Sequence, residues 1–156
     1  MKKWAALLLF FMSFKVSSEE LTPLALYIHA HPDYSSNSLE TEYIANRCGA
    51  LMNVLSKRTK EAGSSKEMKE LSRHYERIGY SFAHLGLLLS KSPKSSEKKF
   101  TALHKELLKQ YADITLRNWK SGNMFKGIIS HDFDMCSAIE PSFEKLSKNL
   151  GQALKK

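Results

Sequence analysis

Seven large apolar residues recur at alternating intervals of three and four through the middle of the chain: Met68, Leu71, Tyr75, Ile78, Phe82, Leu85 and Leu89. This spacing keeps one face of a helix against a neighbouring helix. A second line of small residues runs beside it: Gly79, Ala83, Gly86 and Ser90. Because a glycine inside a helix costs about 1 kcal/mol relative to alanine, we expect another backbone to pack closely there. The pattern predicts a central helix in a helical fold.

Apolar residues recur at helical spacing in three further stretches, at about residues 38–60, 97–121 and 125–154. Residues that favour helix starts precede the first two, Asn37 in one case and Ser95 or Ser96 in the other, and Ser64 or Ser65 precedes the heptad stretch. Asn37 also has a glutamate three residues later, as in a capping box. Together with the heptad stretch, these segments predict four helices.

Pro141 lies inside the last of these stretches, where a proline removes one backbone hydrogen bond and clashes with the preceding turn. We therefore expect the last helix to be kinked or split at Pro141. No stretch shows sustained strand alternation, and the connections are short. The sequence predicts an all-α fold, an antiparallel bundle of about four helices formed by one domain over residues 39–156.

Residues 1–18 have the layout of a secretory signal peptide. The start, MKK, is positive, and the apolar run that follows, WAALLLFFMSF, is shorter than the about 20 residues that span a bilayer. Val16 and Ser18 suit the −3 and −1 positions of a cleavage site; an uncleaved N-terminal anchor is the alternative. No cysteine closely follows the run, so a lipid anchor is not predicted. We expect an exported protein, periplasmic or secreted, whose mature chain begins with an irregular lead segment at residues 19–38.

The charge of the chain is moderately basic. The formal net charge is +8, and removing the lysines at positions 2, 3 and 15 with the signal peptide lowers it to +5. The densest basic stretch, SKSPKSSEKKF at residues 90–100, is interpreted as a solvated turn between helices. No basic motif with interleaved aromatic residues is present, so a nucleic-acid partner is not predicted. If this stretch has a partner, an anionic surface such as acidic lipid or an envelope polymer fits an exported chain better.

The chain has two cysteines, Cys48 and Cys136, which lie on the apolar lines of the first and last predicted helices. These helices are neighbours in an up-down-up-down bundle, and an oxidising compartment would join the thiols. Chain entropy alone would make such a bond worth roughly 4 kcal/mol. Neither cysteine belongs to a C-x-x-C motif. We expect a disulfide; two buried free thiols or one functional thiol are the alternatives.

Arg47 immediately precedes Cys48 in the sequence. On the predicted helix it lies on a line of residues that borders the apolar line containing Cys48. Two interpretations are open. In the first, which we favour, Arg47 is an edge residue with its stem on apolar surface and its charged head in water. In the second, a partly buried guanidinium binds a carboxylate or an anionic ligand through two hydrogen bonds.

The stretch around Arg47, YIANRCGAL at residues 43–51, follows a signal-peptide-like start and precedes three further helical stretches. It resembles small exported helical proteins of marine bacteria and their phages, which share a Y-x-A-x-R-C-x-A-L-like pattern. The resemblance covers nine residues and the overall layout, and Gly49 stands where that pattern more often has alanine. It implies an exported helical protein and supplies no activity.

Histidines and carboxylates supply two further candidate sites. His29, His31 and Asp33 alternate along the lead segment, so in an extended chain they would point the same way and could share a transition metal. Three ligands on a flexible segment without a fourth partner make a weak metal site. Glu70 and His74 lie four residues apart on one helix face, as an ordinary surface pair does. The run HDFD at residues 131–134 is interpreted as favourable charge near a helix start.

These features favour a non-enzymatic helical bundle that binds a partner, such as an envelope protein, or braces the cell envelope. The alternative is a small cofactor or metal carrier, or an enzyme, with a polar site around Arg47, Glu70 and His74. That alternative requires several titratable groups that face one cavity. H-E-x-x-H, G-x-S-x-G and P-loop patterns are absent, and no cofactor is predicted. Self-association through the heptad face is a third interpretation, which an exposed apolar seam would reveal.

Overall fold

The computed structural model describes residues 21–91 and 95–153 and contains five helices in these ranges. They are α1 (Leu24–Ala30), α2 (Ser38–Ala62), α3 (Lys66–Ser90), α4 (Glu97–Lys120) and α5 (Ile128–Ala153). The described residues form no strand, so the predicted all-α class is confirmed, with one helix more than the four expected.

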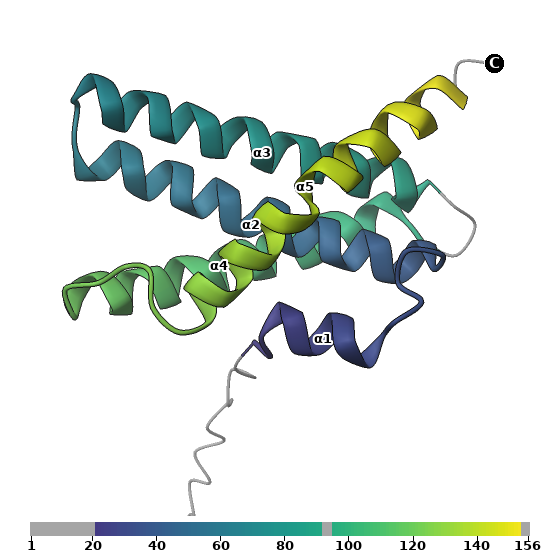
Figure 1. Cartoon of the computed structure of the whole chain (residues 1–156), viewed down its shortest axis with the longest axis horizontal. Coiled ribbons are helices and arrows are strands. Elements are labelled where there is room, and N and C mark those ends of the chain that lie inside the picture. Colours follow the sequence, from purple (N-terminus) through teal and green to yellow (C-terminus); the bar gives the residue numbers. More distant parts are fainter. Residues whose placement is uncertain (1–20, 92–94, 154–156) are drawn as a thin grey trace, which may run out of the picture.

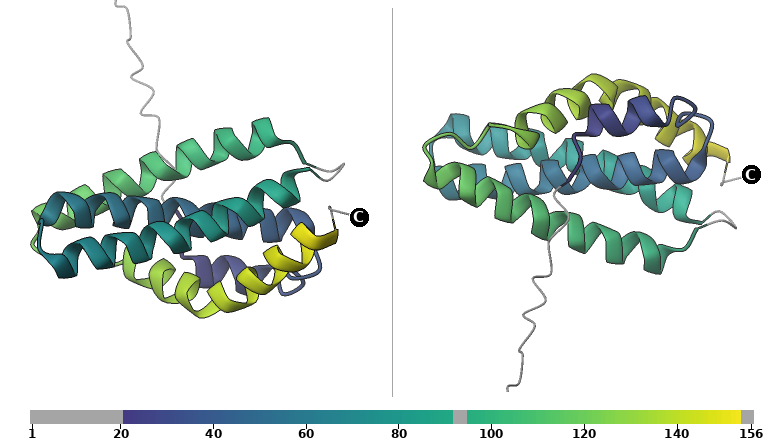
Figure 2. Two further views of the ribbon diagram at one scale, coloured as in Figure 1. Left: turned by 90° about the horizontal axis from the view of Figure 1, so that it is seen from above. Right: turned by 90° about the horizontal axis from the view of Figure 1, so that it is seen from below.

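Three long helices that follow one another in the chain, α2, α3 and α4, alternate in direction, and α2 lies beside both of the others (Figure 1). Figure 2 shows α4 on one side of the α2–α3 pair and α1 with α5 on the other. α5 crosses the pair obliquely and does not run along it (Figure 1). The bundle is therefore layered, and α2 lies in its middle layer.

α2 has the most buried residues of the five helices, and α3, α4 and α5 all pack against it. Its buried side chains occur on every side and include polar ones such as Asn46 and Arg47. The sequence indicated the heptad helix at residues 68–89 as central; α3 does pack against α2, α4 and α5, but fewer of its residues are buried than of α2. A heptad line marks one buried face, whereas α2 carries small and apolar residues around most of its circumference.

The heptad face of α3 is used inside the molecule. Tyr75, Ile78, Phe82 and Leu85 are buried in the core, and among the four, Phe82 and Leu85 are at most 1% exposed. Leu71, near the start of the helix, is 40% exposed and is the most exposed of the seven heptad residues. Little of this face is therefore left for self-association.

Small residues bring α2 and α3 close together, as the sequence predicted. A Cβ atom built on Gly79 of α3 would lie 2.6 Å from the Oδ1 atom of Asn53 on α2. A Cβ atom on Gly49 of α2 would lie 3.2 Å from the backbone nitrogen of Ala83 on α3. Ordinary van der Waals contact begins at about 3.5 Å, so larger residues at these positions would push the helices apart.

Side-chain caps start the three helices α2, α3 and α4. Asn37 accepts a hydrogen bond from the Leu39 N–H at 3.1 Å, and Ser65 and Ser96 each accept one from the N–H three residues later at 3.3 Å. These caps satisfy backbone donors that would otherwise lack a partner. The predicted start signals of these helices are confirmed.

Two local expectations need correction. Residues 19–38 were expected to be irregular, but residues 24–30 form α1, which packs on α5. The last helix was expected to be kinked or split at Pro141, but α5 runs through it as one helix, so a split is not observed. Cys136 and Phe143 are buried on either side of the proline, and this packing holds both halves in place. A kink stays a prediction.

Residues 1–18, the predicted signal peptide, lie outside the described residues. Of the helices that are described, none is both long enough and apolar enough to cross a membrane.

Candidate functional site

A disulfide joins Cys48 of α2 to Cys136 of α5, with their Cα atoms 5.5 Å apart. Both residues are fully buried in the core. The bond connects the two helices that the sequence paired, so in this structure neither cysteine is a free or functional thiol. Closing a loop of this length restricts the unfolded chain and stabilises the fold by a few kcal/mol.

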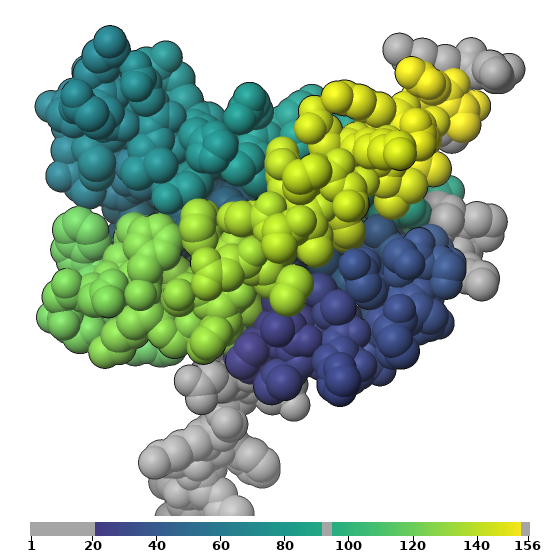
Figure 3. Space-filling view, in the orientation of Figure 1, coloured from purple at the N-terminus to yellow at the C-terminus, as the bar shows by residue number. Residues whose placement is uncertain are grey.

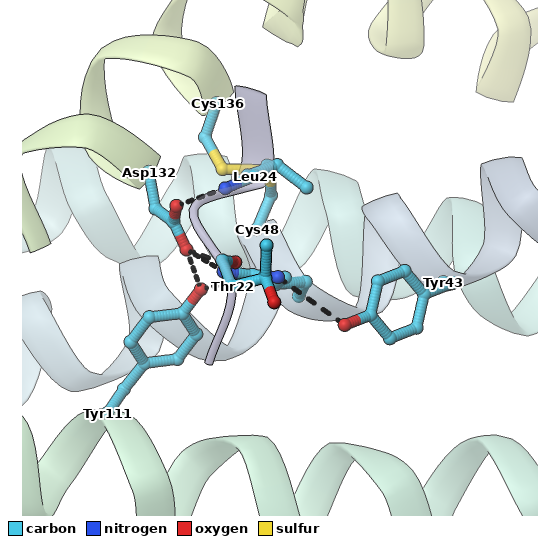
Figure 4. Close-up of polar contacts among 8 residues, drawn as sticks. Thr22, Leu24, Tyr43, Cys48, Tyr111, Asp132 and Cys136 are labelled. Atoms are coloured by element: carbon cyan, nitrogen blue, oxygen red, sulfur yellow. Dashed lines mark hydrogen bonds and ion pairs between the residues drawn. A yellow bond between two sulfur atoms is a disulfide. The ribbon is translucent and has the colours of Figure 1, made fainter. Parts of the chain in front are cut away.

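Arg47 lies beside this disulfide and forms a buried ion pair with Asp132 of α5. Its Nη2 and Nε atoms lie 2.6 Å and 3.0 Å from Asp132 Oδ2, and the two side chains are 1% and 0% exposed (Figure 4). The favoured interpretation of Arg47 as an edge residue was therefore wrong. Groups from α4, α5 and the segment before α1 contact its head group, and sequence periodicity within α2 does not reveal these contacts.

Three further groups complete the pair. The hydroxyl group of Tyr111 on α4 accepts a hydrogen bond from Arg47 Nε at 2.9 Å and donates one to Asp132 Oδ2. Arg47 Nη2 also donates to the carbonyl oxygen of Thr22, and Asp132 Oδ1 accepts from the Leu24 N–H at 2.7 Å (Figure 4). The cluster thus connects α2, α4 and α5 with the start of α1.

The electrostatics of the cluster keep Arg47 charged. Burial lowers the pKa of Arg47, but Tyr111 and Asp132 together raise it more, so the net pKa is raised. Burial, and then the neighbouring Asp132, raise the pKa of Tyr111, so its hydroxyl stays protonated and donates. A charged pair out of water is stable only when its remaining hydrogen-bonding capacity is satisfied, and these donors and acceptors do that.

One nitrogen of Arg47, Nη1, makes fewer and longer hydrogen bonds than the other two. Within the described part of the chain, Nη1 donates a hydrogen bond to the Tyr43 hydroxyl group alone, at 3.4 Å, and Arg47 lines a pocket of about 370 Å³ beneath the start of α1. Gln110 also lines this pocket, and its Oε1 atom is buried without a hydrogen-bond partner among residues 21–91 and 95–153. We call this space the Arg47 pocket. Its remaining lining residues include Tyr27, Tyr43, Leu103, Glu106 and Leu107.

The structure does not bring Arg47, Glu70 and His74 together. Glu70 and His74 are exposed on α3. Glu70 Oε1 lies 3.9 Å from Lys66 Nζ, and His74 Nδ1 lies 3.2 Å from Arg77 Nη2. Neither residue lines the Arg47 pocket. A polar site built from these three side chains is therefore not formed.

The three residues of the possible metal site are also kept apart. His29 is exposed on α1, so the extended geometry assumed for the segment does not apply. His31 packs its ring on Tyr27, with centroids 4.3 Å apart, and its Nδ1 atom lies 2.8 Å from the Tyr27 carbonyl oxygen. Asp33 is exposed in the turn that follows. Among the residues described, no group of three His, Cys, Asp or Glu side chains is placed to hold a metal ion.

Asp132 and Tyr111 are the members of the cluster that sequence reasoning missed. Asp132 was read as part of a charged helix start. A signal for its role was present, because Asp132 lies one turn before Cys136 while Arg47 is next to Cys48. Pairing the cysteines therefore brings the aspartate close to the arginine. Tyr111 gives no such signal, since its position depends on how α4 packs.

The fold and the site define a class: an all-α bundle held together by one disulfide and one buried ion pair. No family model matches the chain, and neither a curated protein nor a solved structure matches it significantly.

Proposed function

We propose that the protein is an exported, non-enzymatic helical bundle that binds a component of the cell envelope. The observation that carries this proposal is the internal pairing of Arg47 with Asp132. The polar cluster around Arg47 and Asp132 is buried. Its hydrogen bonds are made with groups of α4, α5 and the start of α1. A catalytic site needs polar groups that reach a substrate. The cluster is better suited to fixing the shape that the surface presents.

The disulfide supports the proposed location. Structural disulfides form and persist in oxidising compartments and are rare where glutathione keeps thiols reduced. A bond between two fully buried cysteines fits a protein that folds after export. This agrees with the signal-peptide layout of residues 1–18.

Cosedimentation with an insoluble envelope fraction from bacterial cells tests the binding function. We expect the wild-type protein to sediment with the envelope fraction and to remain soluble without it. The double variant Arg47→Met/Asp132→Leu should bind equally well, provided that its circular dichroism spectrum is that of a folded helical protein. Absence of binding by the wild type would overturn the proposal, and selective loss in a folded double variant would place the binding site at Arg47.

A second candidate function, a carrier of a small molecule, has one observation in its favour. The Arg47 pocket is lined by Gln110, whose Oε1 atom has no hydrogen-bond partner in the described residues, and by Arg47, whose Nη1 atom makes one long hydrogen bond. A neutral molecule with one donor and one acceptor fits these two groups. Native mass spectrometry of protein purified from an oxidising periplasm separates the candidates. The binding function predicts the bare chain mass, whereas a carrier would show a reproducible added mass that Gln110→Leu removes.

A further inference from the structure

A groove of about 630 Å³ lies between α3 and the C-terminal half of α5, away from the buried cluster. Figure 3 shows these two segments against each other, α3 in teal and the end of α5 in yellow. We call it the α3–α5 groove; the residues used below are Tyr80, His84, Lys91, Ser147, Lys148 and Gly151.

The groove has an aromatic wall. Tyr80 is 70% exposed, the largest exposed fraction among the bulky apolar and aromatic side chains of the described residues. Its ring lies nearly parallel to that of His84, at an interplanar angle of 10° and a centroid distance of 6.0 Å. The Nδ1 atom of His84 lies 3.1 Å from Ser147 Oγ on α5, which fixes the imidazole ring. The His84 ring of the wall is therefore held in place before any ligand arrives, and the Tyr80 ring is open to water.

The charges of the groove are mainly positive. Lys91 and Lys148 line it, with Glu144 as the acidic residue among its lining. Lys148 lies 2.9 Å from Glu144, and both Lys148 and, more weakly, Arg77 lower the pKa of that carboxyl group. Glu144 is thus already paired, and Lys91 has no ion-pair partner within 4 Å in the described residues. A bound anion would meet attraction along the groove.

We propose that the α3–α5 groove binds an acidic saccharide, whose ring stacks on Tyr80 while its carboxylate pairs with Lys91 and Lys148. This proposal rests on the proposed function and names the class of envelope component that is bound. An exposed aromatic ring offers a flat apolar face with a polar edge, which suits a sugar ring. Two lysines suit one or two carboxylates, whereas a nucleic acid requires a longer series of phosphate contacts.

Isothermal titration calorimetry with tetragalacturonate tests this proposal on the mature, disulfide-bonded protein. We expect saturable binding that weakens as salt concentration rises, since exposed charges are screened. A galactose tetrasaccharide without carboxylates should bind at least about tenfold more weakly, and inorganic phosphate should not compete at equal concentration. Equal affinity for the charged and uncharged sugars would overturn the proposal, as would competition by phosphate alone.

Variants locate the binding. Tyr80→Ala and Lys148→Gln should each weaken tetragalacturonate binding about fivefold or more, because each removes one of the two recognition elements. Lys66→Gln is the matched control, because Lys66 also faces a glutamate four residues away on an exposed helix and does not line the groove. An equal loss in Lys66→Gln would show that only general charge matters and would overturn the proposal.

Gly151 offers a second, independent test. A Cβ atom at this position would have no neighbour within 4 Å, so Gly151→Ala is tolerated. Gly151→Trp should fill the groove and abolish binding in a protein whose thermal midpoint matches that of Gly151→Ala. Unchanged affinity in Gly151→Trp would place the sugar elsewhere. If the protein binds the envelope fraction but not tetragalacturonate, the groove proposal fails and the envelope function stands. If the protein binds tetragalacturonate but not the envelope fraction, the envelope function alone is overturned.

Discussion

Arg47 is the residue on which the packing of four helices depends, since its partners come from α4, α5 and the segment that starts α1. Its importance is structural. A buried charge without its partner is far more costly than a buried apolar side chain. The consequence is an asymmetry between single and paired substitutions.

Removing Arg47 alone should destabilise the protein more than removing the ion pair. Arg47→Met leaves Asp132 buried and unpaired, so we expect a loss of about 3–5 kcal/mol in the free energy of unfolding. In Arg47→Met/Asp132→Leu only neutral groups lose partners, and the loss should be smaller by about 2 kcal/mol. Urea unfolding followed by circular dichroism measures both. Lys148→Met, at an exposed pair, is the control and should change stability by less than about 1 kcal/mol.

His104 gives the fold a pH dependence. Its Nδ1 atom lies 2.6 Å from Asn46 Oδ1, and burial lowers the pKa of His104 more than the hydrogen bond at Asn46 raises it. Because the pKa in the folded protein is below that of the unfolded chain, the folded state binds fewer protons. Stability is therefore complete above the unfolded-state pKa and falls as pH drops through the folded-state value.

The measurement is urea unfolding of the wild type and of His104→Gln at pH 7 and pH 5. The wild type should lose more stability between these two pH values than the variant does. His29→Gln, which changes an exposed histidine on α1, should behave like the wild type. An equal loss in the wild type and in His104→Gln would contradict the assignment.

At the scale of residues, the sequence predicted what depends on local chemistry. The caps at Asn37, Ser65 and Ser96 follow from side chains that bond to their own backbone. The disulfide was predicted from the apolar positions of both cysteines. The burial of Arg47 was not predicted, because the groups that cover it come from distant parts of the chain.

At the scale of elements, glycines set how closely helices pack. Gly86 of α3 faces Phe100 at the start of α4, and a Cβ atom on Gly86 would lie 2.3 Å from the ring. Gly151 of α5 is also helical but has open space around it. The two glycines therefore make a matched pair for testing close packing.

Alanine at these two positions should have opposite effects on stability. Gly86→Ala forces the Phe100 ring to move and should cost about 1–3 kcal/mol. Gly151→Ala gains helix propensity without a clash and should add up to about 1 kcal/mol. Thermal unfolding midpoints measure both effects. A stabilising Gly86→Ala would contradict the packing described between α3 and α4.

α1 shows why a short element escapes sequence analysis. Its seven residues span too little chain for a helical period to be recognised. Its start is also stabilised from outside, because Asp132 of α5 accepts the hydrogen bond of the Leu24 N–H. No side chain of its own segment caps it. Such a helix depends on tertiary contacts and not on local propensity.

At the scale of the whole molecule, the disulfide and the ion pair lie one helical turn apart on α5 and together hold it against α2. The number of long helices followed from sequence periodicity. The oblique course of α5 did not, since periodicity shows which face of a helix is buried and not the angle at which it crosses its neighbours (Figure 1).

Loss of the disulfide should destabilise the bundle without unfolding its helices individually. We expect Cys48→Ala/Cys136→Ala to lower the free energy of unfolding by about 2–5 kcal/mol. The measurement is urea unfolding of the oxidised wild type, the reduced wild type and the double variant. The reduced wild type should match the double variant to within about 1 kcal/mol. Equal stability of all three would show that the bond contributes nothing.

One intact-mass measurement tests whether the protein is exported and closed by a disulfide. The chain is expressed with its own N-terminus in a bacterium, recovered from the periplasm and denatured without reductant. An exported, disulfide-bonded protein should have the mass of residues 19–156 less two hydrogen atoms, and it should gain those two atoms on reduction. Recovery of the full-length chain from the cytoplasm, with both thiols of Cys48 and Cys136 free, would contradict this prediction.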